Sequence, residues 1–344
     1  MRPLLFLLAS AFSLAAAERP EIPQPKPTKP DEPLAKAWSP GKAAEYLDGV
    51  GVNWTRDRQC VTCHTNMPYM MARPLLKGAP SEGWKEVRQF LEDDVAKWNA
   101  GGKPRGDAYV VATATALVFS DNATTGKLHA KTRDALDRMW AVQRKTGEWA
   151  WIKCDWPPLE HDDYYGAVLA AVTTGVAPEK YAETEKAKEG IAKLKAYFEK
   201  MPPPDLHHKA MLLWASSKID GLMSANDRTA TIAELKKLQR VDGGWCLPSL
   251  GKYARRDKTA NDTAAPSDGY ATGLVVYILR QSGVAADDPV IHFGVKWLKK
   301  NQRESGRWFT RSLNNDKAHY IANAGSAFAV MALDACGELA AKGE

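Results

Sequence analysis

One heptapeptide pattern recurs three times and constrains the fold of this chain more than any other feature. The pattern QxxxGxW occupies residues 143–149, 239–245 and 302–308. Each copy ends an amphipathic run and precedes a polar stretch, which is followed by a run rich in small apolar residues. A pattern that repeats together with its flanking segments marks a chain built from one supersecondary unit used several times. We therefore expect helical hairpins, each made of an outer helix, a Gln/Trp corner and an inner helix.

Six hairpins can be counted along the chain. The three that carry the heptapeptide pair residues 133–143 with 164–172, 232–239 with 270–279, and 295–302 with 322–333. Three weaker copies pair residues 43–47 with the segment after His64, 87–98 with 108–119, and 191–200 with 206–217. Six units close naturally into a ring, which predicts an all-α (α/α)6 toroid. An open α-solenoid of Trp-capped hairpins is the alternative.

The residue types of the corner suit a hairpin junction. The Gln amide can bond backbone groups, the Gly permits a left-handed cap, and the Trp packs as a large apolar plug against the neighbouring hairpin. These corners resemble the QW motifs of squalene-hopene cyclases and related terpene cyclases. The resemblance covers roughly residues 40–340 and implies the toroid that these enzymes share with protein prenyltransferase β subunits.

The N-terminal residues do not belong to this repeat. Arg2 precedes an apolar run, residues 4–17, which is too short to span a bilayer and ends in three alanines. We predict a signal peptide at residues 1–17, with an uncleaved anchor as the alternative. Closely spaced prolines then predict an extended Pro-rich linker at residues 18–37. The folded domain is expected at residues 38–344, in an exported protein of the periplasm or the extracellular space, with no transmembrane segment after cleavage.

Charge and cysteine content narrow the functional classes. The net charge of +6, from 47 basic and 41 acidic residues, is spread along the chain and does not indicate nucleic-acid binding. Five cysteines are too few for a disulfide framework. Cys154 and Cys246 each follow a corner, and they could pair as a disulfide after export.

One pentapeptide points to a cofactor. Cys60, Cys63 and His64 form CxxCH, the attachment motif of c-type haem, and about 10⁻³ accidental matches are expected in a chain of this composition. The motif predicts one covalent haem c, with thioethers from the two cysteines and His64 as the proximal iron ligand. A disulfide or a zinc site is the alternative, and zinc would require two further ligands.

The sixth iron ligand depends on the fold. The motif lies at the start of the first inner helix, so haem would lie at the end of the ring where every inner helix begins, which we call the mouth. His161 and His207 stand at the starts of other inner helices and are the candidate distal ligands. A five-coordinate or water-bound iron is equally compatible with the sequence.

A second polar cluster invites a catalytic interpretation. Residues 160–163 read EHDD, at the place where the resemblance puts the DxDD acid motif of squalene-hopene cyclases. The resemblance implies Asp162 and Asp163 as candidate catalytic acids, although the first acid is Glu and the second toroid domain of those cyclases is missing. Capping of the following helix is the simpler alternative.

Three functional hypotheses follow. The first is a redox haem protein that serves electron transfer, sensing or catalysis and meets a redox partner protein. The second is an isoprenoid-processing enzyme that uses Asp162 and Asp163. The third is a module that binds a lipid or a glycan, with haem in a structural role.

Overall fold

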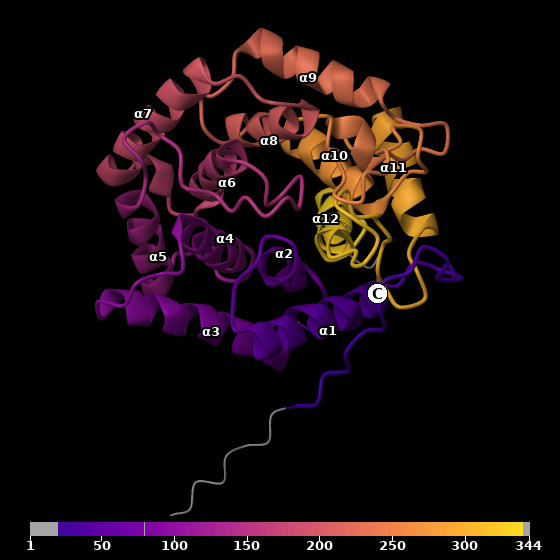
Figure 1. Cartoon of the computed structure of the whole chain (residues 1–344), viewed down its shortest axis with the longest axis horizontal. Coiled ribbons are helices and arrows are strands. Elements are labelled where there is room, and N and C mark those ends of the chain that lie inside the picture. The colour runs from indigo at the N-terminus through magenta and orange to yellow at the C-terminus, as the bar shows by residue number, and fades with distance from the viewer. Residues whose placement is uncertain (1–19, 79, 340–344) are drawn as a thin grey trace, which may run out of the picture.

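The computed structural model describes residues 20–78 and 80–339, and its regular elements there are all helical. Twelve α-helices form two concentric rings (Figure 1). The outer ring consists of α1 (Pro40–Arg58), α3 (Glu82–Asn99), α5 (Ala130–Ala141), α7 (Glu185–Lys200), α9 (Ala225–Lys237) and α11 (Pro289–Lys300). The inner ring consists of α2 (Asn66–Ala72), α4 (Asp107–Thr124), α6 (Asp163–Val176), α8 (Leu206–Ser216), α10 (Gly269–Gln281) and α12 (Ile321–Ala335). The predicted signal peptide, residues 1–17, lies outside the described residues.

The predicted (α/α)6 toroid is confirmed. Each outer helix is followed by an inner helix, and successive hairpins take neighbouring places around the ring (Figure 1). The last inner helix, α12, packs against the first, α2, as well as against α10. The ring is therefore closed, and the open solenoid is excluded.

The Gln side chains of the three corners join consecutive hairpins. The Nε2 of Gln143 donates to Gly147 O and to Gly190 O at the next outer helix. Gln302 makes the same link across the whole chain, since its Nε2 donates to Ser39 O, the residue that caps α1. The first and last hairpins are thus joined by the same type of hydrogen bond that joins consecutive hairpins within the ring.

The corner tryptophans and glycines are equally uniform. Trp149, Trp245 and Trp308 are completely buried, and each Nε1 donates to a backbone carbonyl of the preceding outer helix at 2.8 Å. Gly147 has φ +111°, a left-handed conformation that a side chain would strain. A Cβ there would also lie 2.4 Å from Lys193 O of α7. The pattern therefore encodes close contact between neighbouring outer helices.

Small residues allow the inner helices to crowd around the axis. Every residue of α12 from Ile321 to Leu333 is buried, so that helix is surrounded on all sides. A Cβ on Gly273 of α10 would lie 2.6 Å from the backbone nitrogen of Ala329 in α12, so a side chain there would push the two helices apart. Within residues 20–78 and 80–339, no helix has the length and hydropathy needed to cross a bilayer.

The described part of the Pro-rich segment runs in extended form along the ring. Ala35 N donates to Gln302 O, and Glu304 N donates to Pro33 O. The Glu32 carboxylate lies 3.1 Å from the buried guanidinium of Arg307. These bonds hold the segment against the α11 corner rather than leaving it free in solvent.

Candidate functional site

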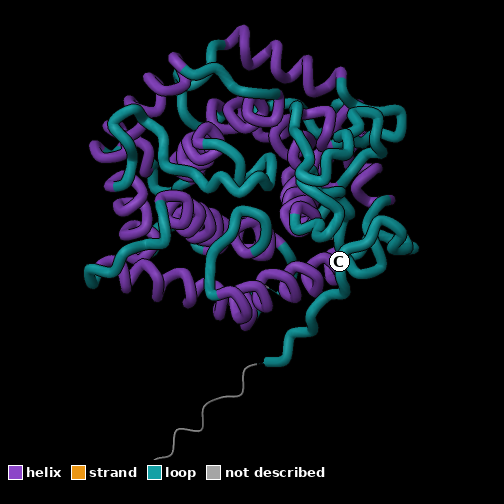
Figure 2. Tube along the Cα trace, viewed as in Figure 1, coloured by secondary structure: helices purple, strands orange, loops and turns teal. Residues whose placement is uncertain are grey.

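The starts of the inner helices meet at the mouth of the toroid, and polar side chains there bond from one helix to the next. Asp162 caps α6 and contacts α8, while His207 of α8 contacts α10. The long connections before α6, α10 and α12 lie over this end (Figure 2). The two clusters described next both belong to the mouth.

The first cluster surrounds the start of α8. Asp205 caps the helix by accepting a hydrogen bond from His208 N. The buried imidazole of His208 lies between two carboxylates: its Nδ1 is 2.7 Å from Asp205 Oδ1, and its Nε2 is 3.0 Å from Asp162 Oδ2. We call Asp162, His208 and Asp205 the carboxylate–imidazole triad.

The triad has strongly perturbed acidities. Burial alone would lower the pKa of His208, but hydrogen bonds and charge from Asp162 and Asp205 outweigh it and raise that pKa to about 9. Burial likewise opposes ionisation of Asp205, yet its bond to His208 lowers the carboxyl pKa to about 2. The pKa of Asp162 is also lowered, because the His208 contacts outweigh burial. The triad therefore holds one cation between two anions at neutral pH.

His207, which precedes His208 on α8, is the fourth residue of this cluster and contacts α10. Its imidazole is completely buried, and its Nε2 lies 2.9 Å from the hydroxyl of Tyr270 on α10. Its Nδ1 is buried without a hydrogen-bond partner. Burial and the neighbouring His208 charge lower the pKa of His207 to about 3, which keeps the ring neutral.

A cavity of about 810 Å³ opens beside the triad. Asp162 and Asp205 line it together with Tyr253. The exposed side chains of His161, Lys237 and Lys252 lie on its wall, so the cavity reaches the surface. A solute can therefore approach the two carboxylates from solvent.

The second cluster is the CxxCH motif at the start of α2. Cys60 is half-buried, Cys63 is buried, and both thiols are free. His64 is buried with Nδ1 2.7 Å from Thr65 Oγ1 and Nε2 3.9 Å from Glu160 Oε1. Burial lowers the pKa of His64 more than the Glu160 charge raises it. The imidazole is thus neutral, and its Nε2 can donate an electron pair to a metal ion.

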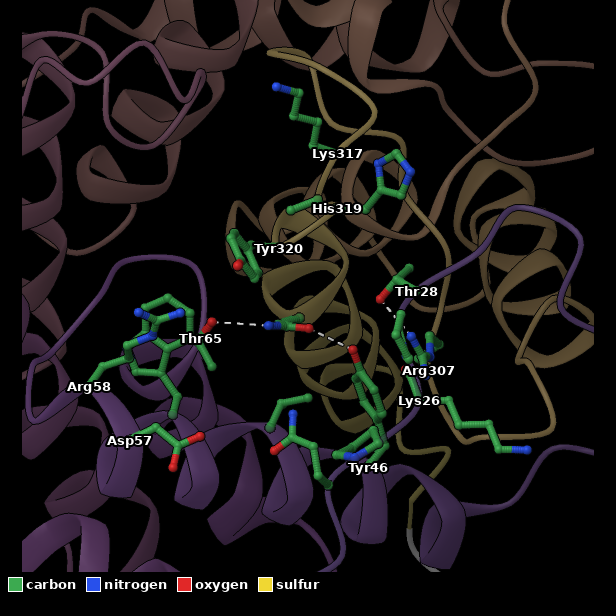
Figure 3. A pocket seen from close by; sticks show the side chains of 17 residues that line it. Lys26, Thr28, Tyr46, Asp57, Arg58, Thr65, Arg307, Lys317, His319 and Tyr320 are labelled. Atoms are coloured by element: carbon green, nitrogen blue, oxygen red, sulfur yellow. Dashed lines mark hydrogen bonds between the residues drawn. The ribbon is translucent and has the colours of Figure 1, made fainter.

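Aromatic rings and a second cavity surround His64. Tyr320 stacks on its ring at 5.2 Å, and Trp54 meets it edge-on at 4.9 Å. Both rings also line a cavity of about 410 Å³, shown in Figure 3 with the cations Arg58 and Lys317 on its wall. Three residues of its lining are hydrogen-bonded in a row (Figure 3): Asn323 Nδ2 donates to Thr65 Oγ1, and the Tyr46 hydroxyl donates to Asn323 Oδ1.

The residues predicted from the sequence occupy different places. Asp162 belongs to the triad, whereas Asp163 turns away to accept from Trp151 N and to pair with Lys153. His161 is exposed, with its ring 6.1 Å from that of Tyr253 on the cavity wall. His207 is buried against Tyr270. Asp162 and His207 are thus brought together at α8, and Asp163 is not.

Two further findings concern single residues. Contacts with His208 outweigh burial and lower the pKa of Asp162, which favours the ionised form of its carboxyl. Cys154 and Cys246 do not form a disulfide: both thiols are free, with Cys154 Sγ 2.9 Å from Glu160 Oε2 and Cys246 Sγ 3.3 Å from Thr263 O.

From the sequence, His208 and Tyr270 could be placed at the mouth but received no role, and Asp205 and Tyr253 were not assigned to the site. An acid and a histidine three residues apart at a helix start are a usable signal, because the pair shares one face of the first turn. The contacts to Asp162 and Tyr270 have no such local signal.

Comparison with known proteins supports the architecture. No family model matches the chain, and no curated protein matches it. Among solved structures, the chain is similar to a possible member of the GH105 family from Salmonella enterica subsp. enterica serovar Paratyphi A str. ATCC 9150, with 12% identity, TM-score 0.51, and coverage of 86% of this chain and 92% of that one. A possible GH105 member from Klebsiella pneumoniae subsp. pneumoniae MGH 78578 gives 11% identity, TM-score 0.52, and coverage of 86% and 91%. At this identity the likeness concerns the fold alone.

These findings correct the resemblance and the functions drawn from it. The assignment to squalene-hopene cyclases and prenyltransferases is wrong, since the matching solved toroids are possible GH105 members. The functional hypotheses of a redox haem protein, an isoprenoid-processing enzyme and a haem-stapled binding module are overturned by the same finding. The physical reason lies in the corner: its Gln and Trp join neighbouring hairpins, so they report ring closure and not a reaction.

Proposed function

We propose that this chain is a glycoside hydrolase whose active site is the 810 Å³ cavity at the mouth. The carboxylate–imidazole triad carries the proposal, because it places two carboxylates on the lining of a cavity that reaches solvent. Enzymes that cleave glycosidic bonds use carboxyl groups beside the scissile bond. The likeness to possible GH105 members supports a sugar as the substrate class.

Asp162 is the group placed to activate water. Its Oδ1 accepts from Tyr165 N, and its Oδ2 lies 3.0 Å from His208 Nε2, so the carboxylate is fixed by two contacts. Its side chain remains 26% exposed on the cavity wall. In the proposed reaction, water bonds to the anomeric carbon, Asp162 takes its proton, and the departing sugar oxygen is protonated from solvent.

The cavity wall carries ammonium groups away from the triad. Lys237 and Lys252 are exposed there, and the one further carboxylate of the lining, Glu234, is already paired with Lys209 at 3.0 Å. An ammonium group bonds a sugar carboxylate more strongly than it bonds a neutral hydroxyl. We therefore propose oligosaccharides that contain uronic acids as the substrate class.

The test is release of reducing ends from a panel of uronate-containing and neutral oligosaccharides. We expect Asp162→Asn to lower kcat about 10²- to 10⁴-fold. Asp163→Asn is the matched control, because the adjacent carboxylate bonds Trp151 N and Lys153 instead of lining the cavity. Failure of the parent protein to cleave any member of the panel would overturn the proposal, as would equal activity of the Asp162 variant.

We propose separately that Cys60 and Cys63 carry one covalent haem c with His64 as proximal ligand. The donor set fits: both thiols are free, and Thr65 holds Nδ1 of His64 while Nε2 is left as a donor. When bound, haem would supply iron-centred chemistry, to which we assign no step. Export through a signal peptide at residues 1–17 agrees with such attachment and is part of this proposal.

A further inference from the structure

We propose that Asp205, His207 and His208 form a binding site for a divalent transition-metal ion of the zinc class, open toward the mouth cavity. The inference goes beyond the proposed hydrolase, because metal binding can be measured without any substrate. One ligand atom from each of the three residues lies within 4.8 Å of the other two.

The unpartnered nitrogen of His207 is the observation that points to a ligand. Its imidazole is completely buried, and Nδ1 has no hydrogen-bond partner, which is costly for a polar atom. The ring cannot turn to relieve this without loss of the contact between Nε2 and the Tyr270 hydroxyl at 2.9 Å. A metal ion would satisfy the nitrogen without disturbing that contact.

The surrounding contacts are those that metal-binding histidines require. Such histidines have the second ring nitrogen bonded to a carboxylate or another polar group, which fixes the ring orientation. Here Nε2 of His208 lies 3.0 Å from Asp162 Oδ2, and Nε2 of His207 meets Tyr270. Both imidazoles are therefore contacted through Nε2, while Nδ1 of His208 meets Asp205 Oδ1 and Nδ1 of His207 has no partner.

The ligand set and its setting suit zinc. Two imidazole nitrogens and one carboxylate oxygen are a common zinc-binding combination, and three protein ligands leave one position for water or substrate. Asp205 lines the 810 Å³ cavity, so that open position would be reachable from solvent. Nδ1 of His208 and Asp205 Oδ1 are 2.7 Å apart, so an ion would replace the Nδ1 proton of the imidazolium, which is released to solvent, and would require side-chain shifts on the order of 1 Å.

Calorimetric titration of the chelator-treated full chain with ZnCl₂ tests the site. We perform it on the Cys60→Ala/Cys63→Ala background, so that these thiols cannot bind the ion. We expect one bound ion per chain, no measurable binding in His207→Ala, and about 10- to 100-fold weaker binding in Tyr270→Phe, which loses the contact behind His207. His292→Ala is the matched control, because that histidine is exposed on α11, and it should bind as the background protein does.

Two further measurements guard against misfolding and against the remaining thiols. Asp205→Asn can still cap α8, since Asn is a good N-cap, and it should weaken zinc binding while circular dichroism shows the helical fold retained. Co²⁺ in place of Zn²⁺ should give a visible spectrum without the intense near-ultraviolet band of thiolate ligation. A thiolate band, unchanged binding in His207→Ala, or no binding at all would overturn the inference. None of these results depends on whether a sugar is cleaved.

Discussion

The two clusters at the mouth each contain a buried histidine, and the pKa values of these two histidines are shifted in opposite directions. His208 at α8 lies between two carboxylates at 2.7 and 3.0 Å, and its pKa rises to about 9 despite burial. His64 at α2 has one carboxylate at 3.9 Å, and burial lowers its pKa. The number and distance of the anions decide which effect prevails. Similar burial thus yields a charged group in one cluster and a neutral donor in the other.

The clusters also differ in how far their partners lie along the chain. His64 is followed directly by Thr65, its Nδ1 partner, and it belongs to a motif of five consecutive residues. His208 takes one carboxylate from α6, and His207 takes its partner from α10. A local motif can be recognised in a sequence, while a cluster assembled by ring closure requires the fold.

The largest expected effect concerns the motif. In protein matured with export and haem-attachment functions, Cys60→Ala/Cys63→Ala should lose covalently bound pigment completely, because the variant has neither thioether sulfur. A haemochrome spectrum after denaturation measures it. Cys246→Ala serves as control and should keep the pigment; pigment in the double variant, or none in the parent, would contradict the cofactor proposal.

The next effect concerns substrate charge at the triad cavity. Lys237→Ala/Lys252→Ala should raise KM for uronate-containing oligosaccharides about 10- to 100-fold, since hydrogen bonds to charged groups contribute roughly 1.5–3 kcal/mol. The value of kcat should change little. Lys26→Ala/Lys317→Ala, which alters the wall of the other cavity, is the control. Equal KM changes in the two double variants would remove the distinction between the cavities.

A smaller effect is expected in the reactivity of the Cys154 thiol, which contacts Glu160. Burial raises the pKa of Cys154 to about 12, with a further contribution from its bond to Glu160. Glu160→Gln should lower this pKa and speed alkylation about three- to tenfold, as expected for a fall of half a unit to one unit. Mass spectrometry gives the rate, and Cys336, whose pKa is raised to about 11 without Glu160, is the internal control. An unchanged Cys154 rate would show that Glu160 has no such influence.

A further prediction concerns how the free energy of unfolding depends on pH through Asp268, at the start of α10. Burial raises the pKa of Asp268 to about 6, against the N–H and hydroxyl groups that bond it. Because the folded state then binds a proton that the unfolded state releases, this group makes the free energy of unfolding fall as pH rises from about 4 to about 6. Asp268→Asn should flatten that part of the profile in denaturant titrations, and a parallel profile would contradict the assignment.

The sequence predicted the ring because its encoding is local. Gln, Gly and Trp within seven residues carry the corner, and small residues carry the inner helices. Gln302 also belongs to a corner, but its partner Ser39 lies 263 residues away, so the bond that closes the ring has only one of its two ends in the local pattern. The corners also led to the wrong enzyme family, because the Gln and Trp contacts stabilise a toroid whatever reaction it catalyses.

The candidate site was only partly predictable. His207 was singled out because it begins an inner helix and Asp162 through the resemblance to the DxDD motif, but the contact of Asp162 with His208 comes from the next hairpin. Asp205 and Tyr253 line the same cavity because the connection before α10, which carries Tyr253, passes close to the start of α8. Sequence spacing carries no information on contacts of this kind.

The most direct test compares the two clusters in one assay. Uronate-oligosaccharide hydrolysis would be measured side by side for the parent, Asp162→Asn and Cys60→Ala/Cys63→Ala, with folding checked by circular dichroism. We expect the Asp162 variant to lose at least about 100-fold in kcat and the cysteine variant to stay within about threefold of the parent. Retained activity in the first and loss in the second would place the reaction at the CxxCH motif and contradict the assignment of the active site to the triad.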